Sequence, residues 1–333
     1  MTKATVSVLA LGGTIAMTQS ALGGVVPTLT GESLVAAVPG LSQLANIDAQ
    51  SFRQLPGAHL GYDDLEALAD HIRTLSDTGS QGVVITQGTD TIEETAFALD
   101  CLLSIETPVI VTGAMRNPTV AGADGPANLL ASVQVALSSN ARSKGCLVVL
   151  SDEIHAARFV RKTHTTGVSA FSSPTCGQVG WISEGQVLFC FDLPKLATVK
   201  RLSSPRSARV ALATVALGDD GRQIDALCAA QFDGMVVQAT GGGHVSPAVA
   251  DALEAAARRM PVVLASRTGA GNTLSNTYGF TGSEIDLQRR GLIRAGWLDG
   301  LKAKVLLTLL LRHGKTGTKS IAQFFEAWGG GRS

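Results

Sequence analysis

The feature that most constrains the fold is a regular alternation of short runs rich in valine and isoleucine with longer segments of helical periodicity. Strands are expected at residues 6–11, 82–86, 108–112 and 146–150, and helices at residues 31–38, 61–77, 91–104 and 125–138. This alternation predicts right-handed βαβ units and a mainly parallel sheet flanked by helices. Ligands of such sheets bind beyond the carboxyl ends of the strands, so functional residues are expected in the loops there.

The alternation lapses between residues 189 and 207, where two prolines and several basic residues follow no clear period. It resumes with strands expected at 209–217, 234–239 and 261–266 and helices at 247–258, 301–312 and 318–328. We therefore predict an α/β protein with a larger N-terminal domain at residues 1–190, a linker at 191–208 and a smaller C-terminal α/β domain at 209–333.

Charge and cysteine usage restrict the classes of partner and compartment. The 27 basic and 27 acidic residues balance, so no basic face for nucleic acid is expected. The five cysteines are scattered without a CxxC pair, and the six histidines show no metal-ligand spacing, so we expect neither disulfides nor a metal. The apolar start lacks a signal cleavage site and the apolar run at 305–311 is too short to span a membrane. These features favour a cytoplasmic protein.

The first predicted strand ends in LALGGTIA, which places a hydroxyl directly after a flexible turn. Gly12 and Gly13 permit the chain to turn sharply, and Thr14 follows them. A turn with a threonine cap is the structural alternative to a functional role. A partial dinucleotide-binding loop is the other, although the full GxGxxG pattern is absent.

The strand at 82–86 is followed by QGTDTIEETA, which contains two signals. Thr91 and Glu94 have the spacing of a capping box, which we expect to begin a helix. Capping does not explain Thr89 and Asp90, so this hydroxyl beside a carboxylate at a strand end is a candidate functional pair.

Two further segments add backbone amides and a base. In TGAMRNPTVAGADGPANL, the amides after Gly113 could polarise a substrate carbonyl, whereas Arg116 and Asp124 could serve equally to tie the loop down. In VRKTHTT, Lys162 lies in a polar run, where a lone lysine is usually solvated. A lysine that reached the hydroxyl–carboxylate pair could instead take a proton from a threonine hydroxyl.

Together these segments resemble the bacterial-type L-asparaginase/glutaminase family. The matches, in the family's order, are GGTIA at 12–16, GTDTIEETA at 88–96, TGAMR at 112–116, ADGPANL at 123–129, VRKTHTT at 160–166 and TYGF at 277–280. The resemblance implies that the N-terminal domain is catalytic. It also implies a homotetramer built as a dimer of close dimers, in which the C-terminal domain contributes to the partner subunit's site.

The reaction that the resemblance implies is hydrolysis of the side-chain amide of asparagine to aspartate and ammonia, without metal or cofactor. Thr14 would be the nucleophile. Thr89, Asp90 and Lys162 would form the supporting triad, and Asp90 would also hold the substrate's α-ammonium. The backbone amides of Thr89 and Ala114 would form the oxyanion hole. The substrate-binding positions implied in this sequence are Gly13, His59, Gly88, Ala114 and Asn272.

The sequence departs from the family's pattern at positions of recognition. The segment at 17–28 lacks the tyrosine that usually assists the nucleophile, so Thr18, Ser20 or Thr28 would have to replace it. Gln87 stands where a histidine is usual, His59 falls where a serine binds the substrate's carboxylate, and Asn272 falls where the partner supplies a glutamate. The turn ATGGGHVSP also lacks its usual asparagine. Loss of a carboxylate near the substrate's ammonium predicts weak binding of free asparagine, or preference for a substrate with a masked or displaced amine.

Three other functions remain as alternatives. One is an amidase that acts on a modified asparagine or a related amide. Another is the amidase subunit of a transamidosome, which usually carries an additional N-terminal domain. The third is a non-catalytic amino-acid-binding protein on the same fold, and the intact threonines, aspartate and lysine argue against it because a sensor needs no activated nucleophile.

Overall fold

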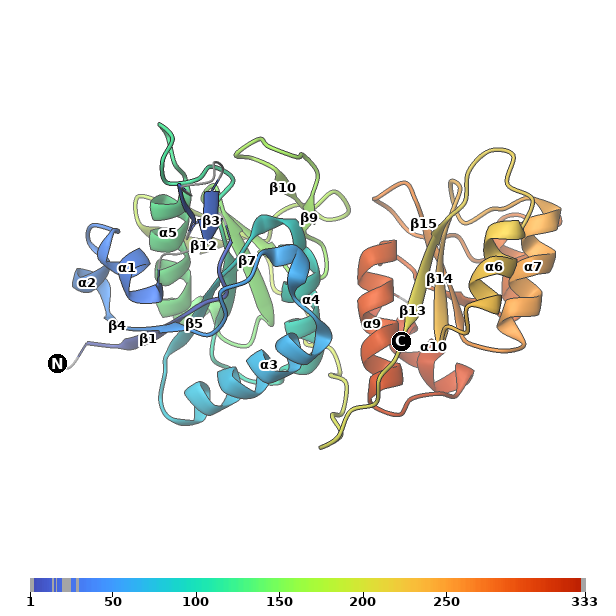
Figure 1. The fold of residues 1–333 in the computed structure, drawn as a ribbon, viewed down its shortest axis with the longest axis horizontal. Helices are drawn as coiled ribbons and strands as arrows, with labels where there is room; N and C mark the ends of the chain where they lie inside the picture. Colours follow the sequence, from blue (N-terminus) through green and yellow to red (C-terminus); the bar gives the residue numbers. More distant parts are fainter. Residues whose placement is uncertain (1–2, 14, 16, 20–24, 28–29, 331–333) are drawn as a thin grey trace. The chain divides into compact units, whose positions relative to one another are not determined.

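The structure is a computed structural model that describes residues 3–13, 15, 17–19, 25–27 and 30–330. The chain divides into two compact units, Met1–Lys195 and Leu196–Ser333. Each unit is built around its own sheet, as Figure 1 shows. The α/β architecture with a larger, mainly parallel N-terminal sheet is confirmed.

The N-terminal unit contains an eight-stranded sheet in the order β12-β11-β8-β7-β6-β5-β1-β4. Five neighbouring strands run parallel. They are β1 (Thr5–Ala10), β4 (Asn46–Ser51), β5 (Gly82–Thr86), β6 (Val109–Thr112) and β7 (Cys146–Leu150). Three short strands extend the sheet antiparallel beyond β7. They are β8 (Glu153–Ala156), β11 (Gly180–Ser183) and β12 (Gln186–Phe189).

The order of these strands fixes where a ligand site can form. β1 pairs with β4 on one side and with β5 on the other, so the chain reverses its direction of travel across the sheet at β1 and β5. Loops that follow such strands diverge and leave a crevice at the carboxyl edge. The two segments that carry GGTIA and GTDT follow β1 and β5, so both lie at this switch point.

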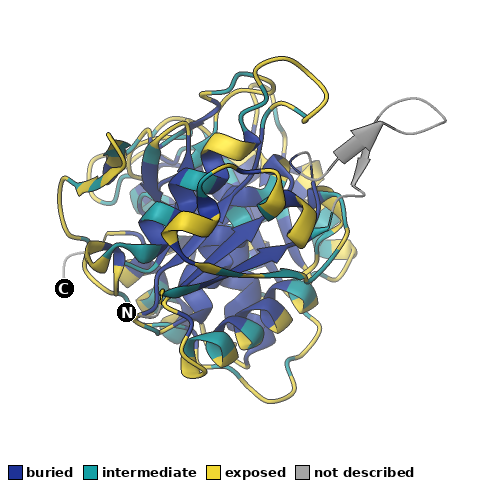
Figure 2. Cartoon of the chain, turned by 90° about the vertical axis from the view of Figure 1, so that its left-hand side faces the viewer, coloured by how far each residue is buried: buried dark blue, intermediate teal, exposed yellow. Residues whose placement is uncertain are grey.

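Helices cover both faces of the N-terminal sheet (Figure 1). α3 (Tyr62–Asp77) packs against α4 (Ile92–Leu102) on one face, and α5 (Gly125–Leu137) packs against β5, β6 and β7 on the other. The short helices α1 (Gly31–Ala36) and α2 (Leu41–Leu44) contact β4. The parallel strands β5, β6 and β7 are buried throughout, and Figure 2 shows buried residues gathered on the strands at the centre. Burial of both faces explains their continuous apolar sequence.

The C-terminal unit is a four-stranded parallel sheet in the order β13-β14-β15-β16. Its strands are β13 (Val210–Thr214), β14 (Gly234–Ala239), β15 (Val262–Ser266) and β16 (Ile293–Arg294). α6 (Arg222–Ala229) and α7 (Pro247–Ala257) pack together on one side, and α9 (Gly300–Arg312) and α10 (Thr318–Trp328) lie on the other (Figure 1). The short helix α8 (Glu284–Arg289) precedes β16.

Several short elements were not expected from the sequence. They are β4, β8, β11, β12, β16, α2, α6, α8, and the pairs β2 (Met17–Gln19) with β3 (Val25–Pro27) and β9 (Arg161–Lys162) with β10 (Phe171–Ser172). The described residues also include the 3-10 turns η2 (Gly57–His59), η3 (Thr89–Thr91) and η4 (Ser139–Ala141). The turns η2 and η3 contact one another and lie at the candidate site.

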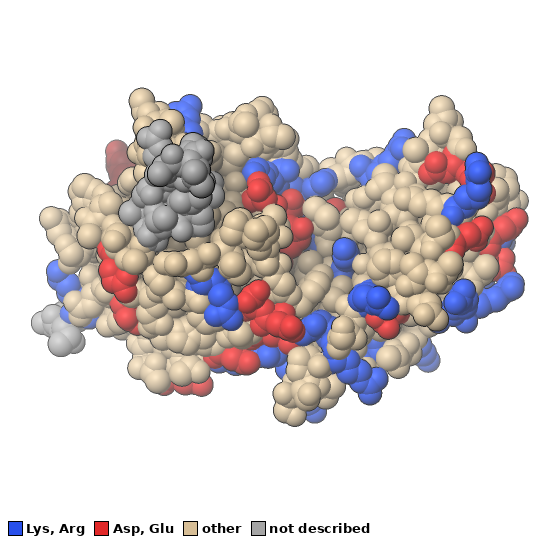
Figure 3. All heavy atoms as spheres, viewed as in Figure 1, with Lys and Arg blue, Asp and Glu red and all other residues tan. Residues whose placement is uncertain are grey.

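The structure also bears on surface charge, membrane-spanning helices and the state of the cysteines. Side chains of both signs lie on each unit in the view of Figure 3. Within the described residues, no helix is long and apolar enough to cross a membrane. All five cysteines are free thiols.

Candidate active site

The structure brings together the lysine and the hydroxyl–carboxylate pair that the sequence singled out. Lys162 Nζ donates to Thr89 Oγ1 at 2.9 Å and to Asp90 Oδ1 at 2.8 Å. The Lys162 side chain is only 14 % exposed, whereas that of Asp90 is 74 % exposed. The solvated-lysine alternative is therefore wrong, and the triad has a partly buried cation, a buried hydroxyl and an exposed carboxylate that can reach an incoming molecule.

The end of one strand and a hairpin position this triad. Thr89 and Asp90 open the turn η3, which two residues separate from the end of β5, while Lys162 comes from β9, where it pairs with Phe171. The backbone N–H of Lys162 also points to Glu93 Oε1, at 3.5 Å, in the first turn of α4. A pocket of about 390 Å³ opens beside the triad and is lined by Asp90, Glu93, Lys162, Thr163, His164 and Thr165.

Glycines let three loops meet backbone to backbone at this edge. A Cβ built on Gly13 would lie 2.0 Å from the nitrogen of Gly88, and Gly13 has φ +86°. A Cβ on Gly57 would lie 2.9 Å from the carbonyl oxygen of Gly88. No side chain fits between these segments, so the loops after β1, β4 and β5 are in direct main-chain contact. Gly13 and Gly88, both predicted as substrate-binding positions, are therefore brought to the same place.

The loop after β6 is tied down by its own side chains. Asp124 accepts hydrogen bonds from the backbone N–H groups of Met115 and Arg116, at 2.9 and 2.8 Å. Asn128 donates to the carbonyl of Gly113 at 3.0 Å and to Asp124 at 3.1 Å. The structural role considered for Asp124 is confirmed. Ala114, whose amide was predicted to belong to the oxyanion hole, is buried within this loop.

The helix start predicted at Thr91 differs from the structure in one respect. α4 begins after Thr91, but the Thr91 side chain makes no capping hydrogen bond. Its hydroxyl instead donates to the carbonyl of Gly57 at 2.9 Å. The predicted capping box is wrong because a tertiary contact takes the hydroxyl, and the sequence pattern did not indicate that Gly57 and Thr91 join two loops beside the site.

His59 and the other predicted positions differ in how far the structure describes them. His59 ends the turn η2 and is exposed next to η3. Thr14, Ser20 and Thr28 lie outside the described residues, as does the side chain of Thr18. Asn272 is exposed in a loop of the C-terminal unit, so its place in the site stays a prediction.

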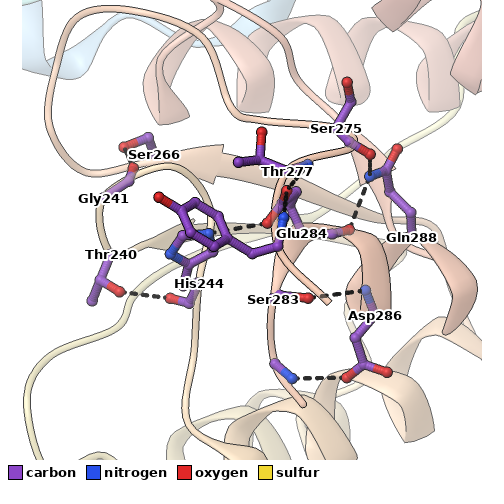
Figure 4. Close-up of polar contacts among 12 residues, drawn as sticks. Thr240, Gly241, His244, Ser266, Ser275, Thr277, Ser283, Glu284, Asp286 and Gln288 are labelled. Atoms are coloured by element: carbon purple, nitrogen blue, oxygen red, sulfur yellow. Dashed lines mark hydrogen bonds and ion pairs between the residues drawn. The ribbon is translucent and has the colours of Figure 1, made fainter. Parts of the chain in front are cut away.

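A second polar cluster lies in the C-terminal unit around Glu284 (Figure 4). The buried Glu284 carboxylate accepts from the backbone N–H groups of Thr277 and Tyr278, both at 2.7 Å, and lies 3.0 Å from His244 Nε2. Burial raises the pKa of this carboxyl, but the hydrogen bonds from Tyr278 and Thr277 outweigh it and lower the pKa below its ordinary value. His244 belongs to the turn that lacks the usual asparagine, and its ring contacts Tyr278 edge-on at 5.0 Å.

Among the residues that the structure describes, no group of three histidine, cysteine or acidic side chains is placed to hold a metal ion.

Comparison with known families agrees with this geometry. The sequence model described as "Asparaginase, N-terminal" matches residues 5–194, and "Glutaminase/Asparaginase C-terminal domain" matches residues 209–325. The chain belongs to the asparaginase family. Several asparaginase relatives match it over more than nine tenths of their length. "L-asparaginase 2" of Escherichia coli is 33% identical over 97% of this chain and 93% of the relative.

Two further relatives differ in the compartment that their names give. "Probable L-asparaginase periplasmic" of Haemophilus influenzae is 34% identical, and the alignment covers 96% of this chain and 92% of the relative. A solved structure, that of a "Probable Cytoplasmic L-asparaginase" from Campylobacter jejuni, is 32% identical with a TM-score of 0.87. It covers 98% of this chain and 100% of the other.

Proposed function

We propose that this protein is an L-asparaginase, an amidohydrolase that converts the side-chain amide of L-asparagine to a carboxylate and releases ammonia. The observation that carries the proposal is the placement of Lys162 Nζ within hydrogen-bond distance of both Thr89 Oγ1 and Asp90 Oδ1 at the switch point of the sheet. Full-length similarity to L-asparaginases supports the same reaction.

In the proposed mechanism, the Thr14 hydroxyl attacks the amide carbon and its proton passes through the Thr89 hydroxyl and Lys162 to the departing ammonia. The backbone N–H groups of Thr89 and Ala114 hold the oxyanion that forms in the transition state. Water then attacks the resulting ester at Thr14, and the same groups relay its proton in the reverse direction. Asp90 holds Lys162 in place and, because its side chain is largely exposed, also binds the substrate's α-ammonium.

Recognition of the substrate is proposed to differ from that of the family's usual members. His59 lies at the end of η2, where an imidazole can donate to the α-carboxylate. Asn272 replaces a carboxylate near the ammonium and so removes an attractive charge. We infer that free L-asparagine binds weakly, and a micromolar KM for L-asparagine would contradict this.

The proposed assembly is a homotetramer of close dimers, in which the C-terminal unit completes the partner's site, and the proposed compartment is the cytoplasm. Equilibrium sedimentation of the purified protein tests the assembly, since a monomer that retains full activity would contradict it.

The activity is tested by steady-state ammonia release from L-asparagine, L-glutamine and D-asparagine. Thr89→Val is the matched control because it keeps the shape of the side chain and removes only the hydroxyl. Release from L-asparagine that is abolished in Thr89→Val supports the proposed chemistry. Release that is the same in both proteins, or absent from all three amides with the wild-type chain, contradicts it.

A further inference from the structure

Two loops of the proposed substrate site are joined by a relay of side-chain hydrogen bonds. Gln87 Nε2 donates to Thr91 Oγ1 at 3.3 Å, and Thr91 Oγ1 donates to the carbonyl of Gly57 at 2.9 Å. Gly57 begins the turn η2, which ends at His59. The relay therefore starts at the end of β5, on the side of Thr89, and ends on the turn that carries His59.

The acceptor carbonyl is part of the turn itself. Gly57 O also accepts from the N–H of Leu60 at 3.3 Å, the backbone hydrogen bond that closes η2. The Thr91 hydroxyl therefore bonds the same carbonyl oxygen that closes the turn. A donor that is itself polarised by a second donor makes a stronger hydrogen bond, and inside a protein this strengthening is not screened by water. Gln87 is fully buried, which places the relay under those conditions.

If folding stability alone decided the residue at position 87, glutamine would be an unfavourable one. Its Oε1 atom is buried and has no hydrogen-bond partner among the described residues, and its Nε2 makes only 3.3 Å contacts, to Thr91 and to the carbonyl of Gly88. A buried acceptor without a partner costs free energy of folding. An apolar side chain of similar size would avoid this cost, so the value of Gln87 lies in what its amide positions.

We propose that Gln87 and Thr91 are positioning residues that set the place of His59 relative to Thr89 and Asp90, and thereby the recognition of the substrate's α-carboxylate. This inference rests on the proposed function. The hydrogen bonds of these two side chains run to each other and to the carbonyls of Gly57 and Gly88, whereas Lys162 bonds Thr89 and Asp90. We therefore expect loss of Gln87 or Thr91 to act on binding of the α-carboxylate and to leave the chemical step intact.

The test compares two isosteric substitutions with a conservative one. Thr91→Val removes the hydroxyl and Thr91→Ser retains it. We expect Thr91→Val to raise KM for L-asparagine about 5- to 10-fold, the loss of one hydrogen bond, with kcat within about twofold. Thr91→Ser should restore KM. Gln87→Leu should raise KM in the same way while its melting temperature stays at or above that of the wild type, which a merely structural role would not produce.

A substrate without the α-carboxylate tests whether the rise in KM comes from recognition of that group. 3-Aminopropanamide is L-asparagine without its α-carboxylate, and kcat/KM for it should be the same in Thr91→Val and the wild type. In a double-mutant cycle, adding His59→Ala to Thr91→Val should raise KM no further. Equal losses on both amides, additive effects in the cycle, or a fall in kcat at unchanged KM would overturn the inference.

Failure of the inference can be told apart from failure of the proposed function. A wild-type chain that releases no ammonia from L-asparagine overturns the function, and hydrogen exchange then decides the positioning role. We expect the amides of His59 and Leu60 to exchange faster in Thr91→Val than in Thr91→Ser. Equal exchange in the two variants overturns the inference whatever the activity.

Discussion

Gly13→Ala tests whether main-chain contact between the loops after β1 and β5 sets the geometry of the site. The new Cβ would lie 2.0 Å from the nitrogen and 2.3 Å from the Cα of Gly88. Ordinary contact begins at 3.4 Å, so the backbone must move apart by about 1.4 Å. A displacement of about 1 Å in a catalytic site can cost about 100-fold in rate. We expect kcat/KM for L-asparagine to fall by about 100-fold or more.

Gly79→Ala is the matched control for this substitution. Gly79 has φ +100°, close to the +86° of Gly13, but a Cβ there meets nothing within 4 Å. Both variants therefore carry the same left-handed backbone penalty of about 1–2 kcal/mol. The assay is ammonia release alongside thermal unfolding. Equal activity in the two variants would refute the reasoning, because only Gly13 brings two main chains into collision.

Three further predictions concern charge. Lys162→Met should lower kcat by about 100- to 10,000-fold, the range for loss of a proton-transferring group, with unchanged circular dichroism, and activity near wild type would contradict the triad. Glu284→Ala should lower the free energy of unfolding by about 2–3 kcal/mol, because the N–H of Tyr278 loses an ionised acceptor. Glu284→Gln should lower it by less. Equal denaturation midpoints of the two variants would contradict this prediction. Burial lowers the pKa of His155 to about 4, below its ordinary 6.5, so the unfolded chain binds the proton first as the pH falls. The free energy of unfolding should therefore have its full value above pH 6.5 and be about 2 kcal/mol lower at pH 5. The neighbouring Glu153 carboxylate is 44 % exposed, so its charge is screened. A His155→Gln variant with the same pH dependence of urea unfolding would contradict this prediction.

The central strands and their helices were predictable because burial on both faces demands continuous apolar sequence. β5 and β7 were predicted with the bounds that the structure gives. β4, with the sequence NIDAQS, escaped prediction because it is a partly exposed edge strand of residues that disfavour strands, and its pairing with β1 decides its conformation. The hairpin of β11 and β12 is only four residues long on each side, too short for a periodic signal.

The candidate site was predictable where a residue type had no local explanation. Thr89 and Asp90 were chosen because capping did not account for them, and Lys162 because a lysine within reach of them could take a proton from a threonine hydroxyl. The structure joins all three side chains. Thr91 was misinterpreted because its spacing to Glu94 satisfied a local rule, while its hydroxyl is used by a loop 34 residues earlier in the chain. A competing tertiary acceptor of this kind leaves no trace in local sequence.

The central place of β1 in the sheet has a consequence for the time course of folding. β1 pairs Thr5 with Asn46 and Val6 with Gly82, whereas β11 and β12 pair Ser183 with Gln186. Closing the longer loops costs more chain entropy and is slower than forming a local hairpin. The strand that is synthesised first must wait for β5 before both its edges are paired. Catalytic competence is therefore expected to emerge late, after most of the secondary structure has already formed.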